Sequence, residues 1–245
     1  MIRYPDASLM SRGIGRSRAP LYRALYPLTP MQKPRIFAAP RSWRRVIAAV
    51  TTVLTLSGTF ALTACDQKPP LSFQNLDITG NTRFASDFSL PDTNGKTRTL
   101  ADYRGQVVVL VFGYTHCPDV CPTTLAELSQ AMQQLGPEKA KHIQVLFVSL
   151  DPERDTPSVL AQYAAAFNPL FRALRPADGS QLKKIATDFN LVYEKVAGSS
   201  ADNYTMNHTA ASLVFDTQGK LRLYVRDAQG AQSWVHDLGE LLDAT

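Results

Sequence analysis

Cysteine is scarce in this chain of 245 residues, which contains only Cys65, Cys117 and Cys121. Small secreted scaffolds that are held together by disulfides need a much higher density of cysteine, so the sequence excludes that class. The 180 residues that follow Cys65 are enough to build a hydrophobic core without such bridges. Each of the three cysteines therefore needs an explanation of its own.

Positive charge is scarce outside the N-terminal region, although the whole chain has a net charge of +5. Residues 1–65 contain 10 Lys/Arg and one acidic residue, whereas residues 66–245 contain 16 Lys/Arg and 20 Asp/Glu. The C-terminal part therefore lacks the basic surface that nucleic-acid binding requires, and we expect no nucleic-acid partner. The basic character of the chain belongs to its N-terminal leader.

The leader contains an uncharged apolar stretch, Val46 to Leu62, which follows three arginines within residues 41–45. A charged region followed by an apolar region is typical of an export signal. The stretch ends in Leu62-Thr63-Ala64-Cys65, which resembles the lipobox of bacterial lipoproteins, so we expect Cys65 to be lipidated. An uncleaved transmembrane helix over Val46 to Ala64 is the alternative, because that stretch is just long enough to span a membrane.

Both types of anchor export the following domain and tether it to a membrane. Asp66 resembles an inner-membrane retention signal, so the expected location is the periplasmic face of the bacterial inner membrane. Residues 1–65 are thus interpreted as a leader with a lipoprotein-type signal. A start at Met31 gives a leader of more usual length, so residues 1–30 are interpreted as an artefact of the assigned gene start. Residues 66–82 are polar and contain prolines, which predicts a flexible tether.

Residues 83–245 are predicted to form one domain. Val107–Phe112 and Ile143–Leu150 are continuous apolar runs, typical of strands that are buried on both faces. Helices are predicted over 123–135, 157–167, 179–189 and 231–243, and further strands over 87–90, 97–100, 191–196, 210–215 and 221–225. This order predicts an α/β, thioredoxin-like fold with an added N-terminal β-hairpin and an extra helix.

Cys117 and Cys121 follow the first buried strand and precede a helix. Open α/β sheets bind ligands at such a junction, and the N–H groups at the start of the helix favour thiolate over thiol. In a regular helix this spacing separates the Cβ atoms by about 5–6 Å, whereas a disulfide needs about 3.5–4.5 Å. Pro118 and Pro122 allow a distorted first turn. The pair can therefore close a disulfide or bind a soft metal, for which a third ligand would complete a trigonal Cu(I) site.

Three motifs resemble those of the Sco/SenC family of copper chaperones. They are GYTHCPDVCPTTL at residues 113–125, VSLDPERDTP at 148–157 and YTMNHT at 204–209. The likeness covers about residues 83–245, with the motifs in the same order. It implies a thioredoxin-like copper-binding domain in which Cys117, Cys121 and His208 are the metal ligands. Asn207 replaces an aspartate that the family usually has, which would change the charge or hydrogen bonding around His208.

The resemblance implies a metallochaperone that holds a copper ion, Cu(I) or Cu(II), and delivers it to the binuclear copper centre of cytochrome c oxidase during assembly. The copper-centre subunit would be its partner, beside other periplasmic copper or thiol-redox proteins. The alternative is a periplasmic thiol–disulfide oxidoreductase, in which Cys117 and Cys121 form a redox-active disulfide and act on the cysteines of copper-site proteins. No proline lies between Lys195 and Phe215, where thioredoxins have a cis-proline, so we favour a metallochaperone over an enzyme.

Other polar residues of the motifs have supporting roles in this interpretation. Adjacent side chains on a turn diverge, so His116 is expected to tune the site without binding the metal. Asp119 is expected to order the turn between the cysteines through hydrogen bonds from its side chain. Asp151, Arg154 and Asp155 follow the second buried strand, where they could order a loop or dock a partner.

Overall fold

The computed structural model describes residues 70–200 and 203–244 of the chain. The predicted leader, the lipidation site Cys65 and the alternative transmembrane segment lie outside the described residues. A search of the part that is described finds no helix with the length and apolar character needed to span a membrane.

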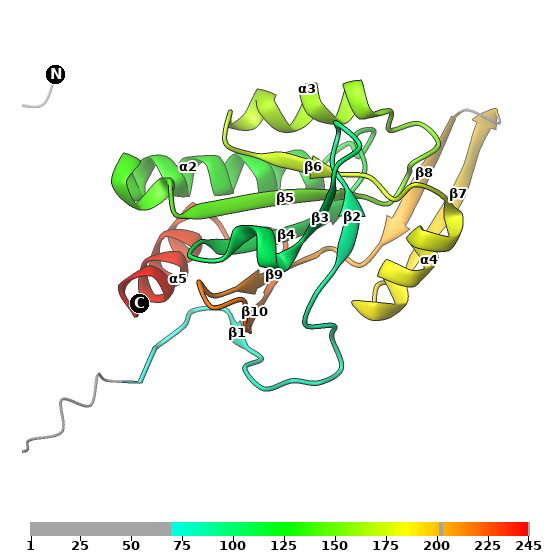
Figure 1. Cartoon of the computed structure of the whole chain (residues 1–245). Coiled ribbons are helices and arrows are strands. Elements are labelled where there is room, and N and C mark those ends of the chain that lie inside the picture. Colours follow the sequence, from blue (N-terminus) through cyan, green and yellow to red (C-terminus); the bar gives the residue numbers. More distant parts are fainter. Residues whose placement is uncertain (1–69, 201–202, 245) are drawn as a thin grey trace, which may run out of the picture. The chain divides into compact units, whose positions relative to one another are not determined.

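Figure 1 shows the order of the helices and strands along the chain. The strands are β1 (Leu76–Asp77), β2 (Ser89–Pro91), β3 (Thr97–Thr99), β4 (Val107–Gly113), β5 (Ile143–Ser149), β6 (Arg172–Leu174), β7 (Tyr193–Ser200), β8 (Asn203–His208), β9 (Ala211–Phe215) and β10 (Leu221–Arg226). The helices are η2 (Leu100–Tyr103), α2 (Val120–Ala140), α3 (Pro157–Phe167), α4 (Gly179–Asp188) and α5 (Ala231–Asp243).

Six of the described strands form the central sheet, in the order β1-β10-β9-β4-β5-β6. Strand β4 lies at its centre, parallel to β5 and antiparallel to β9. Every residue of β4 is buried, because helices or hairpins cover both faces of the sheet. Successive side chains of a strand point to opposite faces, so β4 contributes alternate residues to two separate hydrophobic clusters.

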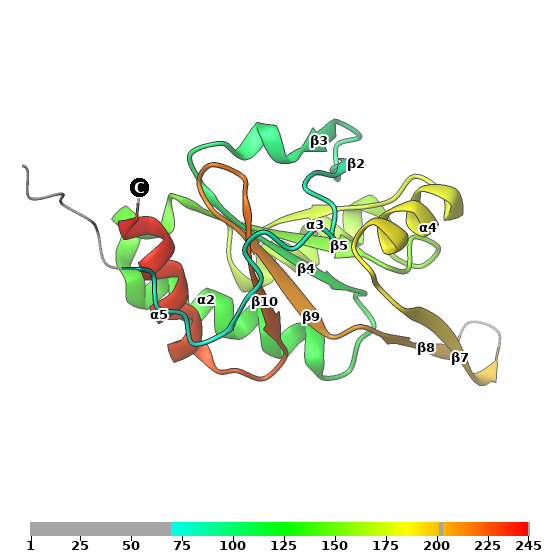
Figure 2. The ribbon, with the colours of Figure 1, turned by 90° about the horizontal axis from the view of Figure 1, so that it is seen from below.

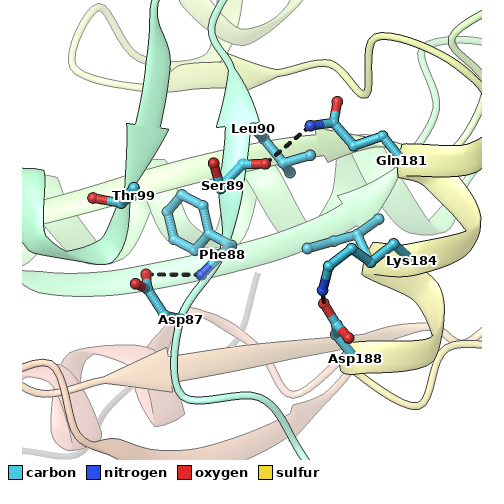
Figure 3. Close-up of a pocket in the computed structure, with 9 residues that line it drawn as sticks. Asp87, Phe88, Ser89, Leu90, Thr99, Gln181, Lys184 and Asp188 are labelled. Atoms are coloured by element: carbon cyan, nitrogen blue, oxygen red, sulfur yellow. Dashed lines mark hydrogen bonds and ion pairs between the residues drawn. The ribbon is translucent and has the colours of Figure 1, made fainter.

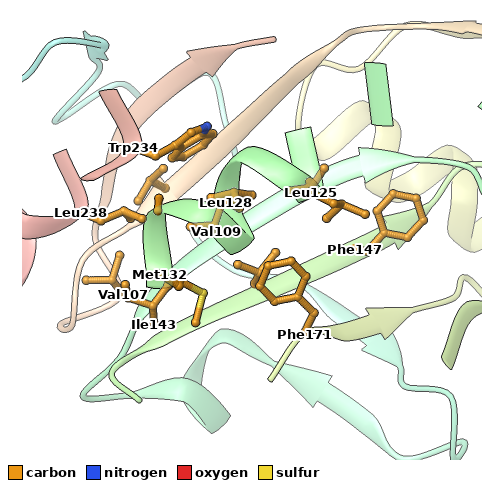
Figure 4. Packing of buried hydrophobic residues seen from close by; sticks show 14 of the residues in the cluster. Val107, Val109, Leu125, Leu128, Met132, Ile143, Phe147, Phe171, Trp234 and Leu238 are labelled. Atoms are coloured by element: carbon orange, nitrogen blue, oxygen red, sulfur yellow. The ribbon is translucent and has the colours of Figure 1, made fainter. Parts of the chain in front are cut away.

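Helices α2, α3 and α5 supply the first cluster, and Figure 4 shows α2 and α5 packing on the central strands. Its side chains include Leu125 and Leu128 of α2 and Trp234 of α5. Helix α4 covers the other face together with η2 and the hairpin β2–β3 (Figure 2). Cys121 belongs to the first cluster, so the sheet separates it from α4.

The structure confirms the thioredoxin-like α/β fold, with β2–β3 as the N-terminal hairpin. Some elements differ from the predictions. Strands β1, β6 and β8 and the short helix η2 were not predicted, and α2 begins at Val120 and continues beyond the predicted end at residue 135. The helix is kinked there, because Gly136 has a φ of 80° and is followed by Pro137.

Part of the segment predicted as a tether packs on the domain. Strand β1 pairs with β10, and the backbone N–H groups of Gln74 and Asn75 donate to the carboxylate of Asp237 at 2.8 and 2.9 Å. Asp237 is fully buried in α5. The packed part of the chain therefore begins before residue 83. The sequence hides this feature because both residues of β1 are exposed, and because Asp237, to which Gln74 donates, lies 163 positions further along the chain.

An open hollow of about 450 Å³ lies between β2 and α4 (Figure 3). Gln181 donates a hydrogen bond to the backbone carbonyl of Ser89 at one side, and Lys184 pairs with Asp188 at the other. Phe88, which lines it, belongs to the second cluster. This hollow therefore lies on the opposite face of the sheet from Cys121.

Candidate metal centre

The first two candidate ligands lie at the carboxyl end of β4, as predicted. The chain leaves β4 at Gly113, turns through residues 114–119 and enters α2 at Val120. The turn is closed by the N–H of Cys117, which donates to the carbonyl of Tyr114 at 3.2 Å. Cys121 lies in the first turn of α2 and is buried, whereas Cys117 precedes the helix and is partly exposed.

The third candidate ligand, His208, is brought to the cysteines by β8, the second strand of the β7–β8 hairpin. Along β8, Met206 is buried, Asn207 is exposed and His208 is half-buried. Because side chains alternate along a strand, Asn207 points away from the face that carries His208. The replacement of the family's aspartate by Asn207 therefore does not place the amide beside the cysteines.

The sulfur atoms of Cys117 and Cys121 and a ring nitrogen of His208 all lie within 4.8 Å of one another. Cys121 Sγ lies 3.8 Å from His208 Nε2. The other ring nitrogen, Nδ1, lies 3.0 Å from the carbonyl oxygen of Thr209. Donation from Nδ1–H to that carbonyl leaves Nε2 free as a lone-pair donor, which is the tautomer that a metal ligand needs.

The two cysteines share one proton unequally. The thiol of Cys121 donates to the sulfur of Cys117, and this hydrogen bond is the main cause that lowers the pKa of Cys117 to about 5. Backbone N–H groups at the start of α2, including that of Cys121 at 3.5 Å, also stabilise the Cys117 thiolate. The same thiol–thiolate bond, together with burial, raises the pKa of Cys121 above its usual range.

Both cysteines are free thiols in this structure. The structure therefore gives the reduced form of the pair. The disulfide between Cys117 and Cys121 remains a prediction for the oxidised form.

Asp155 ties the cysteine loop to the end of β5. Its fully buried carboxylate accepts hydrogen bonds from the hydroxyls of Thr115 and Ser149, each at 2.6 Å. The N–H of Thr115 also points at this carboxylate, at 3.2 Å. Burial raises the pKa of Asp155, so its charged form depends on these donors. Of the two predicted roles for this residue, the contacts favour loop ordering.

Asp151 and Arg154 tie the hairpin that carries His208 to the same loop. Their ion pair has a distance of 2.6 Å, and the hydroxyl of Tyr204 in β8 donates to Asp151 at 2.7 Å. The guanidinium of Arg154 lies 3.5 Å from the centre of the Tyr204 ring and donates to its backbone carbonyl at 2.9 Å. These contacts hold the hairpin through both the backbone carbonyl and the side chain of Tyr204.

Tyr114 connects the cysteine loop directly to the histidine strand, a role that the sequence did not predict. Its hydroxyl accepts a hydrogen bond from the N–H of Met206 at 3.2 Å. Its ring meets the ring of His208 edge to face, with centroids 6.0 Å apart. The only available signal was its place in the first motif, between the strand and Cys117.

Two predicted supporting roles have different outcomes. His116 is exposed and is not among the three clustered ligands; its Nδ1 lies 3.2 Å from the hydroxyl of Thr115. The predicted side-chain role of Asp119 is wrong, because its side chain makes no capping hydrogen bond. Asp119 contributes its backbone carbonyl instead, which accepts from the N–H of Thr123 at 3.1 Å.

Two thiol sulfurs and one imidazole nitrogen form a soft donor set that suits a copper ion. The set is open on one side, since Cys117 and His208 are only partly buried, while Cys121 is enclosed. An ion held here would be reached by an incoming ligand from the Cys117 and His208 side. The residues present therefore fit a metal that is bound and also exchanged.

Comparison with known families agrees with this geometry, since a model of the SCO1/SenC family matches residues 77–243. The chain belongs to the SCO1/SenC family. Among its relatives is a SCO2-like protein of Rickettsia felis, which is 30% identical over 72% of this chain and 86% of its own length. The mitochondrial SCO2 homologue of Bos taurus is 35% identical, and the match spans 60% of this chain but only 55% of the bovine protein.

A solved structure of a SCO1/SenC relative contains a metal. Bradyrhizobium japonicum ScoI with copper bound is 34% identical to this chain and has a TM-score of 0.57. The match covers 65% of this chain and 99% of the ScoI chain. The similarity therefore extends over the fold that carries the Cys–Cys–His group.

The low pKa of Cys117 predicts a distinct pH dependence of its reactivity. In metal-free protein we expect alkylation of Cys117 to follow a titration with a midpoint near pH 5, because the thiolate is the reactive form. Cys121→Ala removes the hydrogen bond that lowers this pKa, so the midpoint should rise toward the ordinary value of 9.0. Mass spectrometry of the modified peptide measures both rates. A midpoint that Cys121→Ala leaves unchanged would contradict the shared-proton description.

Proposed function

We propose that this SCO1/SenC protein binds a copper ion through Cys117, Cys121 and His208 and delivers it to the binuclear copper centre of cytochrome c oxidase during assembly. The observation that carries the proposal is the clustering of two sulfurs and one imidazole nitrogen within 4.8 Å. The copper-bound relative ScoI supports the choice of metal. Family membership supports the choice of recipient.

Copper loading has a simple proton balance in this site. The thiolate of Cys117 and the neutral Nε2 of His208 can bind without losing a proton. Cys121 must give up the proton that it shares with Cys117, and the positive charge of the metal favours this loss. Binding of Cu(I) by the reduced pair therefore releases about one proton from the two thiols.

Delivery would proceed by ligand exchange, in an order set by exposure. Cys117 and His208 are partly exposed and Cys121 is buried. A thiolate or imidazole of the recipient would replace the exposed ligands first. The buried sulfur of Cys121 would dissociate from the copper ion last. The hydrogen bonds and ion pair of the hairpin hold His208 near the ion until the recipient's ligands arrive.

A thiol–disulfide oxidoreductase acting on copper-site proteins is the second candidate, and the low pKa of Cys117 favours it. The Cys117 thiolate would attack a target disulfide and release one target thiolate. Cys121, after losing its proton, would attack the mixed disulfide and release the second target thiolate as the Cys117–Cys121 disulfide forms. The raised pKa of Cys121 slows this second step, so we favour copper delivery.

We also propose that the domain is held at the periplasmic face of the inner membrane through a lipid on Cys65. The lipobox-like Leu62-Thr63-Ala64-Cys65 and the following Asp66 support this location. A membrane anchor would confine the copper donor and its recipient to one surface.

His208→Ala separates the two candidate functions. We expect the affinity for Cu(I) and Cu(II) to fall by more than about 100-fold, because the substitution removes a ligand that the remaining residues cannot replace. Disulfide-reductase activity should stay largely intact, since both cysteines remain. Competition with a chromophoric copper chelator measures the affinity, and reduction of a model disulfide measures the activity.

His142→Ala is the matched control, because His142 is exposed and lies at the start of β5. It should leave both measurements unchanged. Copper affinity that His208→Ala does not alter, with reductase activity intact, would reject the copper-delivery proposal in favour of the oxidoreductase.

Cys65→Ser tests the anchor. Metabolic labelling with a fatty-acid analogue should mark the unmodified chain and fail in Cys65→Ser, because the serine cannot form the thioether to the lipid. Cys117→Ser should keep the label, which controls for a general effect of losing a thiol. Labelling that persists in Cys65→Ser would exclude this residue as the lipid site.

A further inference from the structure

Gly113 is the last residue of β4 and lies directly against the buried ligand Cys121. It is buried, and it pairs with Ser149 of β5. Its carbonyl accepts a hydrogen bond from the N–H of Leu150 at 2.7 Å. The backbone at this position is therefore fixed by the sheet and cannot shift away from the cysteine.

A side chain at this position has no room. A Cβ atom built on Gly113 would lie 2.5 Å from Cys121 Sγ, and 2.9 and 3.2 Å from two ring atoms of Phe147. Contacts below 3.0 Å are essentially never seen for real Cβ atoms. Both neighbours are enclosed: the ring of Phe147 is fully buried and packs against Tyr163, with centroids 5.3 Å apart.

The need for glycine here is steric and not conformational. The turn glycines Gly95, Gly105 and Gly136 have positive φ values of 80–85° and open space around them. Gly113 is in regular strand conformation, paired in register with β5, so its backbone would accept any residue. What distinguishes it is the sulfur atom that occupies the place of a side chain.

We infer that Gly113 is a positioning residue. Because it has no side chain, it leaves the space that Cys121 Sγ occupies beside Cys117 and His208. This inference rests on the proposed copper function of that site. In this position beside Gly113, Cys121 Sγ lies 3.8 Å from His208 Nε2. An alanine at 113 would push the more movable of its neighbours, the thiol, out of the three-ligand geometry by rotation about its χ1 angle.

Gly113→Ala in the full-length chain tests the inference. We expect its Cu(I) affinity to fall by about 10–100-fold, as happens when groups that orient metal ligands are lost. The thiolate-to-Cu(II) charge-transfer absorption should shift, because it reports the position of the sulfur relative to the ion. The displaced Cys121 thiol should also be alkylated more than about 5-fold faster in the metal-free protein, because it leaves its buried position and becomes accessible to the reagent.

Gly179→Ala is the matched control. Gly179 begins α4, on the face of the sheet away from Cys121, and a Cβ atom added there meets nothing within 4 Å. This variant should keep the copper affinity, the absorption and the alkylation rate of the unmodified chain.

The double variant Gly113→Ala with Phe147→Leu separates sulfur displacement from crowding of the core. Leucine removes the ring that the new methyl group meets, but the overlap with Cys121 Sγ remains. We expect the thermal stability of the metal-free protein to recover while copper affinity stays low. This variant also supplies the copper measurement if Gly113→Ala alone does not fold.

Three results would overturn the inference: copper affinity and absorption unchanged in Gly113→Ala, copper affinity that recovers together with stability in the double variant, or an unchanged Cys121 alkylation rate. A failure of the unmodified chain to bind copper would count against the proposed function. In that case the alkylation rate, which needs no metal, still decides whether Gly113 positions the Cys121 sulfur.

Discussion

The contact between Cys121 Sγ and His208 Nε2, at 3.8 Å, joins two segments that are 87 residues apart in the chain. Neither segment could hold its ligand in place alone, since one is a helix start and the other the end of a two-stranded hairpin. The contact depends on β4 and β9 lying side by side in the sheet, because β4 leads into the cysteine loop and His208 lies just before β9. The rest of the site secures these two segments against each other.

Polar residues in the loop after β5 make most of the contacts that hold the cysteine loop and the histidine hairpin together. Asp155 binds the cysteine loop through Thr115, while Asp151 and Arg154 bind the histidine hairpin through Tyr204. One short loop therefore fixes both halves of the site. Groups that orient metal ligands in this way typically affect metal affinity as well as structure. This explains why the second motif resembles the family although none of its residues lies within the ligand cluster.

The fold was predictable because its strongest signals are local. The buried runs of β4 and β5 and the helical spacing of α2 gave correct element types, and the kink at Gly136 explains why the predicted end of α2 at residue 135 fell short. Strand β8 was missed although its hairpin partner β7 is adjacent in the chain, because its anchor Asp151 is distant in sequence. The packing of Gln74 and Asn75 on Asp237 was missed for the same reason. Cys117 and Cys121 could be placed from the strand–helix junction, whereas His208 came only from the family resemblance.

X-ray absorption spectroscopy of the Cu(I)-loaded protein tests the central claim most directly, because it counts the atoms bound to the metal by type. The proposed site predicts two sulfur ligands and one nitrogen ligand per copper ion, with the nitrogen supplied by His208. A site with sulfur ligands alone, or one with two nitrogens and a single sulfur, would contradict the three-ligand geometry formed by Cys117, Cys121 and His208.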